Sequence, residues 1–128
     1  MRVLVCGGRD YTDRAKVWRV LDALKAQVKK EGDTIILIEG KCRTGADKHA
    51  GDWAVCNLPV QQHLQFPADW TTYGNSAGPI RNRQMLEQGK PDLVIAFGGR
   101  NGTDHMVAIS KAKNPPPMIV EFDRCDEA

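Results

Sequence analysis

The stretch Val3-Leu-Val-Cys-Gly-Gly-Arg-Asp10 joins a short apolar run to two glycines and a pair of charged residues. Four more apolar runs follow along the chain, at residues 34–38, 60–66, 93–97 and 118–122. All but one are close to continuously apolar, as expected for strands of a parallel sheet that helices cover on both faces. The run over 60–66 alternates with polar residues, which favours a position towards an edge of the sheet.

Helical patterns separate these runs. The first spans about residues 12–30, because apolar residues recur at helical spacing from Val17 to Val28 and Gly32 supplies a stop. Three further helices are expected to begin near Thr44, Pro79 and Thr103. Strands that alternate with helices predict right-handed βαβ units. We therefore expect residues 1–128 to form one α/β domain, a doubly wound sheet of five parallel strands in the order 3-2-1-4-5.

The composition is that of an ordinary globular protein, with 128 residues of which 41% are hydrophobic and 27% charged. A net charge of +2 and the lack of a dense basic stripe argue against a nucleic-acid partner. No apolar stretch approaches the roughly 20 residues that span a bilayer, and the first residues do not form a secretory signal. We expect a cytoplasmic protein with no membrane partner.

The cysteines and histidines do not predict a metal site. Cys6, Cys42, Cys56 and Cys125 contain no C-x-x-C pair, and the three histidines are scattered. Cys6 ends an apolar run and is expected to be a buried thiol. Cys42 lies in a candidate binding loop, so a reactive thiol is its functional alternative. We expect neither a metal nor a cofactor.

Glycine-rich loops follow three of the expected strands, at the carboxyl edge where open α/β sheets bind ligands. A helix follows each loop, so unpaired N–H groups and the positive end of a helix dipole face that edge, which suits phosphate. Glycine also lets a ligand approach the backbone. The expected ligand-binding residues in these loops are Gly7, Gly8, Arg9, Asp10, Gly40, Lys41, Arg43, Thr44, Gly45, Asp47, Gly98, Gly99, Arg100, Asn101, Gly102 and Thr103.

Several of these side chains have more than one interpretation. Asp10 and Asp47 either bind ribose hydroxyls or cap helices, and Thr44 and Thr103 either cap helices or donate to phosphate. In the long irregular segment 67–78, Trp70 either stacks on a base or packs within the loop. Neither G-x-x-x-x-G-K-[ST] nor G-x-G-x-x-G is present, which argues against a P-loop NTPase and a dehydrogenase.

Taken in order, five segments resemble the SLOG superfamily, specifically its small YspA-type branch. They are V-L-V-C-G-G-R-D, E-G-K-C-R-T-G-A-D-K-H-A-G-D-W-A, F-P-A-D-W, A-G-P-I-R-N-R-Q-M-L and D-L-V-I-A-F-G-G-R-N-G-T-D-H-M. The resemblance implies a Rossmann-like fold that binds an ADP-ribose-like molecule or a nucleoside phosphate. It also implies a homodimer or higher homo-oligomer and a role in phage–bacterium conflict. Asp69, Trp70, Arg81 and Asn82, in the third and fourth segments, join the expected ligand-binding residues.

The chain is distantly similar to the SLOG phosphoribohydrolases that activate cytokinins, which carry an arginine ahead of P-G-G-x-G-T-x-x-E. Arg81 matches the arginine, but Met106 stands at the glutamate and Arg100 at a glycine. A methionine cannot supply the missing carboxylate. The resemblance therefore favours a protein that senses or sequesters its ligand without cleaving it. An N-glycoside hydrolase using Arg81 with Asp10 or Asp47 (or Asp69) is the alternative. A DNA-processing relative suggests single-strand binding as a third.

Overall fold

The strand β1 (Arg2–Gly7) lies at the centre of the sheet in the computed structural model, which describes residues 1–124. Five parallel strands form this sheet in the order β3-β2-β1-β4-β5, as predicted. The other four strands are β2 (Ile36–Glu39), β3 (His63–Gln65), β4 (Leu93–Phe97) and β5 (Met118–Phe122). Val3 is in register with Leu37 on one side and Leu93 on the other. The loops that follow β1, β2 and β4 therefore emerge at one edge.

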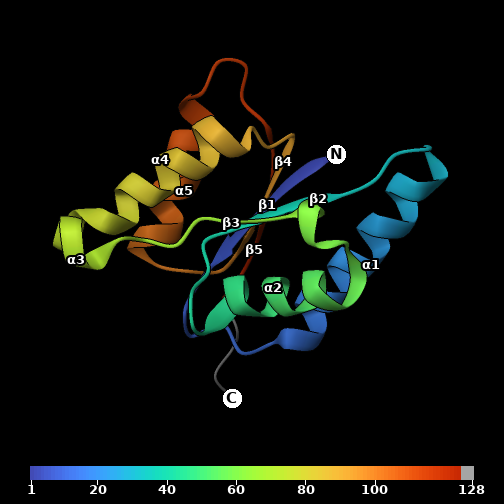
Figure 1. Ribbon diagram of the computed structural model, residues 1–128, viewed down its shortest axis with the longest axis horizontal. Helices are drawn as coiled ribbons and strands as arrows, with labels where there is room; N and C mark the ends of the chain where they lie inside the picture. The colour runs from blue at the N-terminus through green and yellow to red at the C-terminus, as the bar shows by residue number, and fades with distance from the viewer. Residues whose placement is uncertain (125–128) are drawn as a thin grey trace.

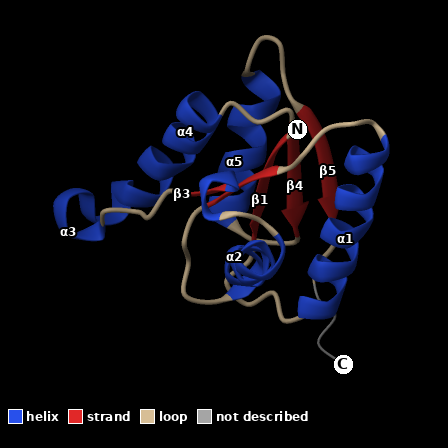
Figure 2. Cartoon of the chain, turned by 45° about the vertical axis from the view of Figure 1, so that its right-hand side comes forward, coloured by secondary structure: helices blue, strands red, loops and turns tan. Residues whose placement is uncertain are grey.

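Helices cover both faces of the sheet. They are α1 (Arg14–Lys30), α2 (Gly45–Asn57), α3 (Trp70–Tyr73), α4 (Ala77–Gly89) and α5 (Asn101–Ala112). Figures 1 and 2 show α1 and α2 on one side of the strands and α4 and α5 on the other. Alternate residues of β1 serve the two layers: Val3 and Val5 pack in the cluster with α1 and α2, while Leu4 and Cys6 pack with α4 and α5. Trp53 of α2 is fully buried in the first cluster.

Helix starts differ from expectation by one to two residues. Asp13 caps α1 by accepting a hydrogen bond from the Lys16 N–H at 3.0 Å, so the helix begins at Arg14. Pro79 and Thr103 lie within the first turns of α4 and α5 and do not begin them. In each case the preceding residues already have helical geometry, which a proline or threonine signal alone does not reveal.

The two edge strands differ from expectation, one in its length and the other in its exposure. The run over 60–66 is edge structure as predicted, but Val60–Gln62 forms a 3-10 turn and only His63–Gln65 pairs with β2. The run 118–122 is not covered on both faces, because Met118 is 68% exposed and Val120 37% exposed. An apolar run by itself cannot distinguish an edge strand from a central one.

The segment 67–78, expected to be irregular, contains the single turn of α3 and a 3-10 turn at Gly74–Ser76. Asp69 caps α3 by accepting a hydrogen bond from the Thr72 N–H at 3.0 Å. In Figure 1 this segment projects from the body of the molecule beside the start of α4. No helix within residues 1–124 is both long enough and apolar enough to cross a membrane. Cys125, one of the four cysteines, lies outside the described residues.

Candidate functional site

A cavity of about 680 Å³ opens at the carboxyl ends of the central strands, between the starts of α4 and α5. We call it the first cavity. Its volume lies within the range of small-molecule pockets. Twelve of the residues predicted from sequence line it: Gly7, Gly8, Arg9, Asp10, Asp47, Trp70, Arg81, Asn82, Arg100, Asn101, Gly102 and Thr103. The structure thus brings together loops that follow β1 and β4 with the start of α4.

A second cavity of about 840 Å³ adjoins the first on the side of β2. Predicted residues that line only this cavity are Gly40, Lys41, Arg43 and Thr44. Five residues line both cavities: Arg9, Cys42, Asp47, Trp70 and Arg81. The predicted site is therefore divided into two compartments that meet at these five shared residues.

Four predicted residues line neither cavity: Gly45, Asp69, Gly98 and Gly99. Gly45 has φ +81°, and a Cβ there would strike the Gly8 carbonyl oxygen and the Arg9 backbone. A Cβ at Gly98 would strike the backbone of Asp123 and Arg124, and the side chain of Asp69 caps α3. Their roles in the structure are to shape the loops.

Arg81 on α4 connects both compartments. Its Nη1 donates to the carbonyl oxygen of Gly40 at 2.6 Å and lies 3.9 Å from the Sγ of Cys42. Its Nε donates to Asn82 Oδ1 at 3.1 Å, and Asn82 Nδ2 donates in turn to the Gly102 carbonyl at 3.1 Å. This chain of hydrogen bonds ties α4 to the loop after β2 and to the start of α5.

Asp47 is the buried carboxyl group of the shared region. It is 5% exposed, and its Oδ2 accepts a hydrogen bond from the Gly40 N–H at 2.9 Å. Burial raises the pKa of Asp47 to about 6, although the charge of Arg81 and the Gly40 N–H act in the opposite direction. The prediction of a capping role is wrong, because Thr44 is the N-cap residue of α2 and neither side chain caps the helix.

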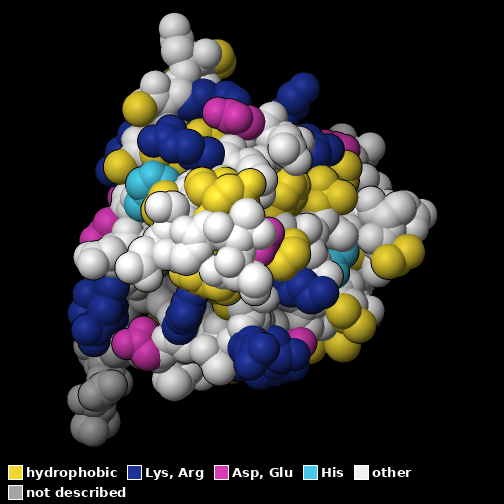
Figure 3. Space-filling model, turned by 60° about the vertical axis from the view of Figure 1, so that its left-hand side comes forward, with side chains coloured by type: hydrophobic (Ala, Val, Ile, Leu, Met, Phe, Trp, Pro, Cys, Tyr) yellow, Lys and Arg dark blue, Asp and Glu magenta, His cyan; other side chains and the backbone are white. Residues whose placement is uncertain are grey.

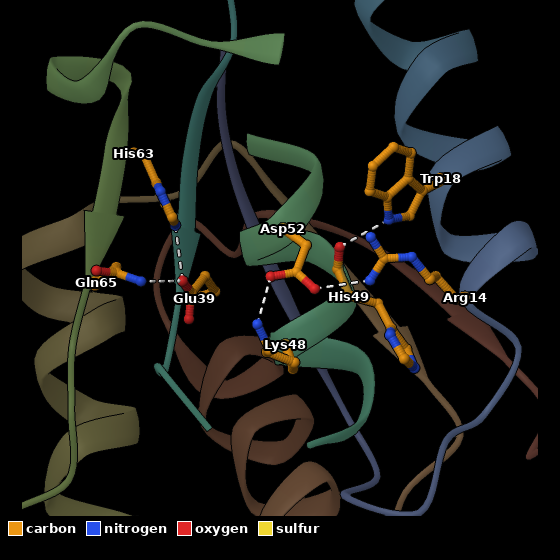
Figure 4. A network of polar contacts seen from close by, with 8 residues as sticks. All are labelled: Arg14, Trp18, Glu39, Lys48, His49, Asp52, His63 and Gln65. Carbon is orange, nitrogen blue, oxygen red and sulfur yellow. Dashed lines mark hydrogen bonds and ion pairs between the residues drawn. The ribbon is translucent and has the colours of Figure 1, made fainter. Parts of the chain in front are cut away.

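Glu39, at the end of β2, is a site residue that the sequence prediction missed. It is 1% exposed, and its Oε2 is 2.7 Å from His63 Nε2 and 2.9 Å from Gln65 Nε2 on the neighbouring strand (Figure 4). Its Oε1 accepts a hydrogen bond from the Lys41 N–H, which helps to hold Lys41 at a left-handed φ of 52°. A signal for this residue was present in the sequence: an acid directly before Gly40, and two polar residues, His63 and Gln65, that alternate along the next expected strand.

Exposed side chains of the first cavity contact one another at longer distances than the buried ones. The Arg9 guanidinium lies 5.3 Å from the ring centroid of Trp70, which remains 49% exposed. Arg100 Nη2 is 3.7 Å from Asp10 Oδ2, and both side chains are largely exposed. Capping does not explain Asp10 or Thr103, because Asp13 caps α1 and Arg100 occupies the N-cap position of α5. Asp10 and Thr103 both line the first cavity.

Three further side chains bear on the chemistry of the site. Burial, followed by the charge of Asp47, raises the pKa of the Cys42 thiol, which argues against a reactive thiolate. Burial, followed by the charge of Arg83, lowers the pKa of His105. Met106 is fully buried in the core and does not line the first cavity. Within the described part of the chain, no group of three or more His, Cys, Asp or Glu residues can hold a metal.

Lys and Arg side chains do not form one stripe on the side of the molecule where α3 lies. Figure 3 shows them interspersed with acidic and uncharged side chains. A groove that tracks a nucleic-acid backbone needs a more continuous positive surface.

The model of the YspA, cpYpsA-related SLOG family matches residues 1–73. The chain belongs to this family. The gene 61 protein of Mycobacterium phage D29 is similar to this SLOG protein, at 35% identity over 94% of this chain and 95% of its own length. No solved structure matches the chain. The family match covers the loops after β1 and β2 with Asp47 and Trp70, whereas Arg81 and residues 100–103 lie beyond it.

Proposed function

We propose that this SLOG protein binds a nucleotide-derived small molecule, an ADP-ribose-like compound or a nucleoside phosphate, and thereby senses or sequesters it. The observation that carries the proposal is the first cavity, which combines glycine loops, a helix start and three arginines at the carboxyl edge of the sheet. Membership of the family supports the same class of ligand. The similar protein of a mycobacteriophage is consistent with a role in phage–bacterium conflict.

The first turn of α5 is the proposed phosphate position. Asn101, Gly102 and Thr103 line the cavity there, and the N–H groups of a first helical turn have no partner within the helix. Arg100, at the N-cap position, adds a positive charge beside them. The half-exposed ring of Trp70 offers an aromatic surface for the base at the mouth of the cavity.

Ligand release from the purified protein tests the proposal directly. Heating the protein and analysing the supernatant by mass spectrometry is expected to detect a nucleotide-derived compound. Calorimetric titration with AMP and ADP-ribose then gives affinities for the wild type and two variants on α4. Arg81→Ala should weaken binding at least tenfold, because Arg81 lines both cavities. Arg83→Ala, exposed and outside both cavities, is the matched control. No release and no binding would contradict the proposal.

Asp47 supports a second function, hydrolysis of an N-glycosidic bond. A carboxyl group whose pKa is raised to about 6 is suited to exchange protons near neutral pH, and Asp47 lies close to Arg81. In this reaction Asp47 accepts a proton from water as the water oxygen bonds to the anomeric carbon. The C–N bond breaks, and its electron pair leaves with the base. A nucleoside base then takes up the proton that Asp47 gives back, whereas nicotinamide leaves as a neutral molecule and that proton passes to solvent. Asp10 is exposed and Asp69 caps α3, so neither fits this role as well.

Product analysis distinguishes the two functions. NAD, ADP-ribose and nucleoside monophosphates are incubated with the protein, and the products are separated by chromatography. Release of free base or nicotinamide that Asp47→Asn abolishes would establish hydrolysis. Binding without turnover in the wild type would exclude it for these substrates and leave sensing or sequestration.

A further inference from the structure

The residues that line only the second cavity have no role in the proposed contacts with phosphate and base. Each cavity alone has the volume of a small-molecule pocket, about 680 Å³ and about 840 Å³. A mononucleotide in the first cavity therefore leaves a ligand-sized space beside it. The five residues that line both cavities form the junction between them.

The acidic groups of the second cavity already have partners. Glu39 accepts hydrogen bonds from the Lys41 N–H and Gln65 Nε2 and lies 2.7 Å from His63 Nε2. Asp52 lies 2.7 Å from Arg14 Nη1 and 2.6 Å from Lys48 Nζ. Figure 4 draws both contacts as dashed lines. Asp52 is therefore compensated by two cations, and the oxygens of Glu39 are occupied by hydrogen bonds inside the protein. Asp47, which also lines this cavity, accepts the Gly40 N–H.

Two of the cations that line only the second cavity have no ion-pair partner among residues 1–124. Lys41 and Arg43 line it, both are exposed, and neither forms a salt bridge with a described residue. They flank Cys42, and Glu39 fixes the backbone of Lys41 in the left-handed region. The two cations are thus held on a defined loop beside the junction.

We propose that the second cavity binds a second anionic group of the same ligand. The preferred ligand is then an extended nucleotide derivative with phosphate groups at two separated positions, one in each cavity. Arg81 and Asp47 at the junction contact the part of the ligand between them. This inference rests on the proposed function and names its ligand class more narrowly.

Three nucleotides of increasing extent test the inference by calorimetry: AMP, ADP-ribose and 2′-phospho-ADP-ribose. The last carries an additional, separated phosphate and is expected to bind at least tenfold more tightly than ADP-ribose. The double variant Lys41→Asn, Arg43→Gln should abolish that advantage and weaken AMP binding far less. Asparagine is used because it tolerates a positive φ, so the loop keeps its shape. Lys29→Ala, Lys30→Ala removes the same charge from exposed positions on α1, outside both cavities, and should change nothing.

The outcomes separate this inference from the proposed function. The second anion site would be contradicted if the double variant lost equal affinity for AMP and for 2′-phospho-ADP-ribose. It would also be contradicted if the added phosphate gave the wild type no gain in affinity. Both results would leave the proposed nucleotide binding intact. Titration with inorganic pyrophosphate covers the case in which no nucleotide binds. Suppose that pyrophosphate binds, that binding is lost in the Lys41→Asn, Arg43→Gln variant, and that it persists in Arg100→Ala. This result would support the anion site in the second cavity and contradict the nucleotide function. If neither pyrophosphate nor nucleotide binds, both proposals fail.

Discussion

The loops after β2 and β4 flank the central strand, yet they are shaped by different forces. Glycines shape the loop after β4, because a Cβ at Gly98 or Gly99 would meet neighbouring atoms at 2.6 Å or less. Buried carboxylates shape the loop after β2, where Asp47 accepts the Gly40 N–H and Glu39 accepts the Lys41 N–H. The loop after β4 depends on the absence of side chains, whereas the loop after β2 depends in addition on carboxyl groups that accept its N–H groups. Only the second should respond to pH or to the loss of one carboxylate.

The largest change in the free energy of unfolding is expected when a side chain is added to the loop after β4. Gly98→Ala should lower the free energy of unfolding by about 4 kcal/mol, because its Cβ would meet backbone atoms that cannot move aside easily. Gly102→Ala lies in the same region with nothing within 4 Å of its Cβ. That variant should be neutral or stabilising by up to about 1 kcal/mol. Urea unfolding measures both, and similar losses in the two variants would contradict the steric explanation.

Asp47, which holds the loop after β2, should make the free energy of unfolding depend on pH. The folded protein raises the pKa of Asp47 from 3.8 to about 6, so it favours the protonated carboxyl. That contribution is fully present below about pH 4 and is lost as the pH rises through about 6. Asp47→Asn lacks this pH-dependent contribution. As the pH rises from 4 to 7, the unfolding free energy of the variant should therefore increase relative to that of the wild type by on the order of 3 kcal/mol.

Exposed Asp104 on α5 provides the control for this pH series. The difference between Asp104→Asn and the wild type should stay nearly constant over the same range. An Asp47→Asn curve that runs parallel to the wild-type curve would show that Asp47 keeps an ordinary pKa in the folded protein.

A smaller loss is expected from removing the charge of Glu39 while keeping its shape. Glu39→Gln should lower the free energy of unfolding by about 2 kcal/mol, because a buried amide cannot accept from all the donors that the carboxylate satisfies. Glu87→Gln, exposed on α4, should stay within about 0.5 kcal/mol of the wild type. Thermal or urea unfolding gives the comparison. A loss no greater than that of the control would mean that charge does not hold the loop.

The smallest effect concerns ligand affinity at the loop after β4. Arg100→Ala should weaken binding of the co-purified ligand or of AMP about tenfold, or about 1.4 kcal/mol, through loss of one exposed charge beside the phosphate. Arg19→Ala, exposed on α1, should bind as the wild type does. Unchanged affinity in Arg100→Ala would place the phosphate elsewhere.

The sequence predicted what depends on periodicity and on strand ends. Alternation of apolar runs with helical patterns indicated the parallel sheet and its order, and the glycine loops indicated part of the lining of both cavities. The predicted order already placed β5 at an edge, but the exposure of Met118 escaped prediction because an apolar run does not reveal how much of a strand the helices cover. Glu39 escaped because its partners, His63 and Gln65, are brought to it by strand pairing. The division into two cavities likewise depends on tertiary placement of Arg81 and Trp70.

The central place of β1 also has a consequence for how the protein folds. Val3 pairs with Leu37 and with Leu93, so the strand at the centre of the sheet has one of its partners far along the chain. Closing that long loop costs entropy before any contact compensates for it, and parallel pairings of this kind fold slowly. The half of the sheet containing β1, β2 and α2 can collapse first. The first cavity needs β4 and α5 as well, so ligand-binding competence should be among the last properties that the folding chain acquires.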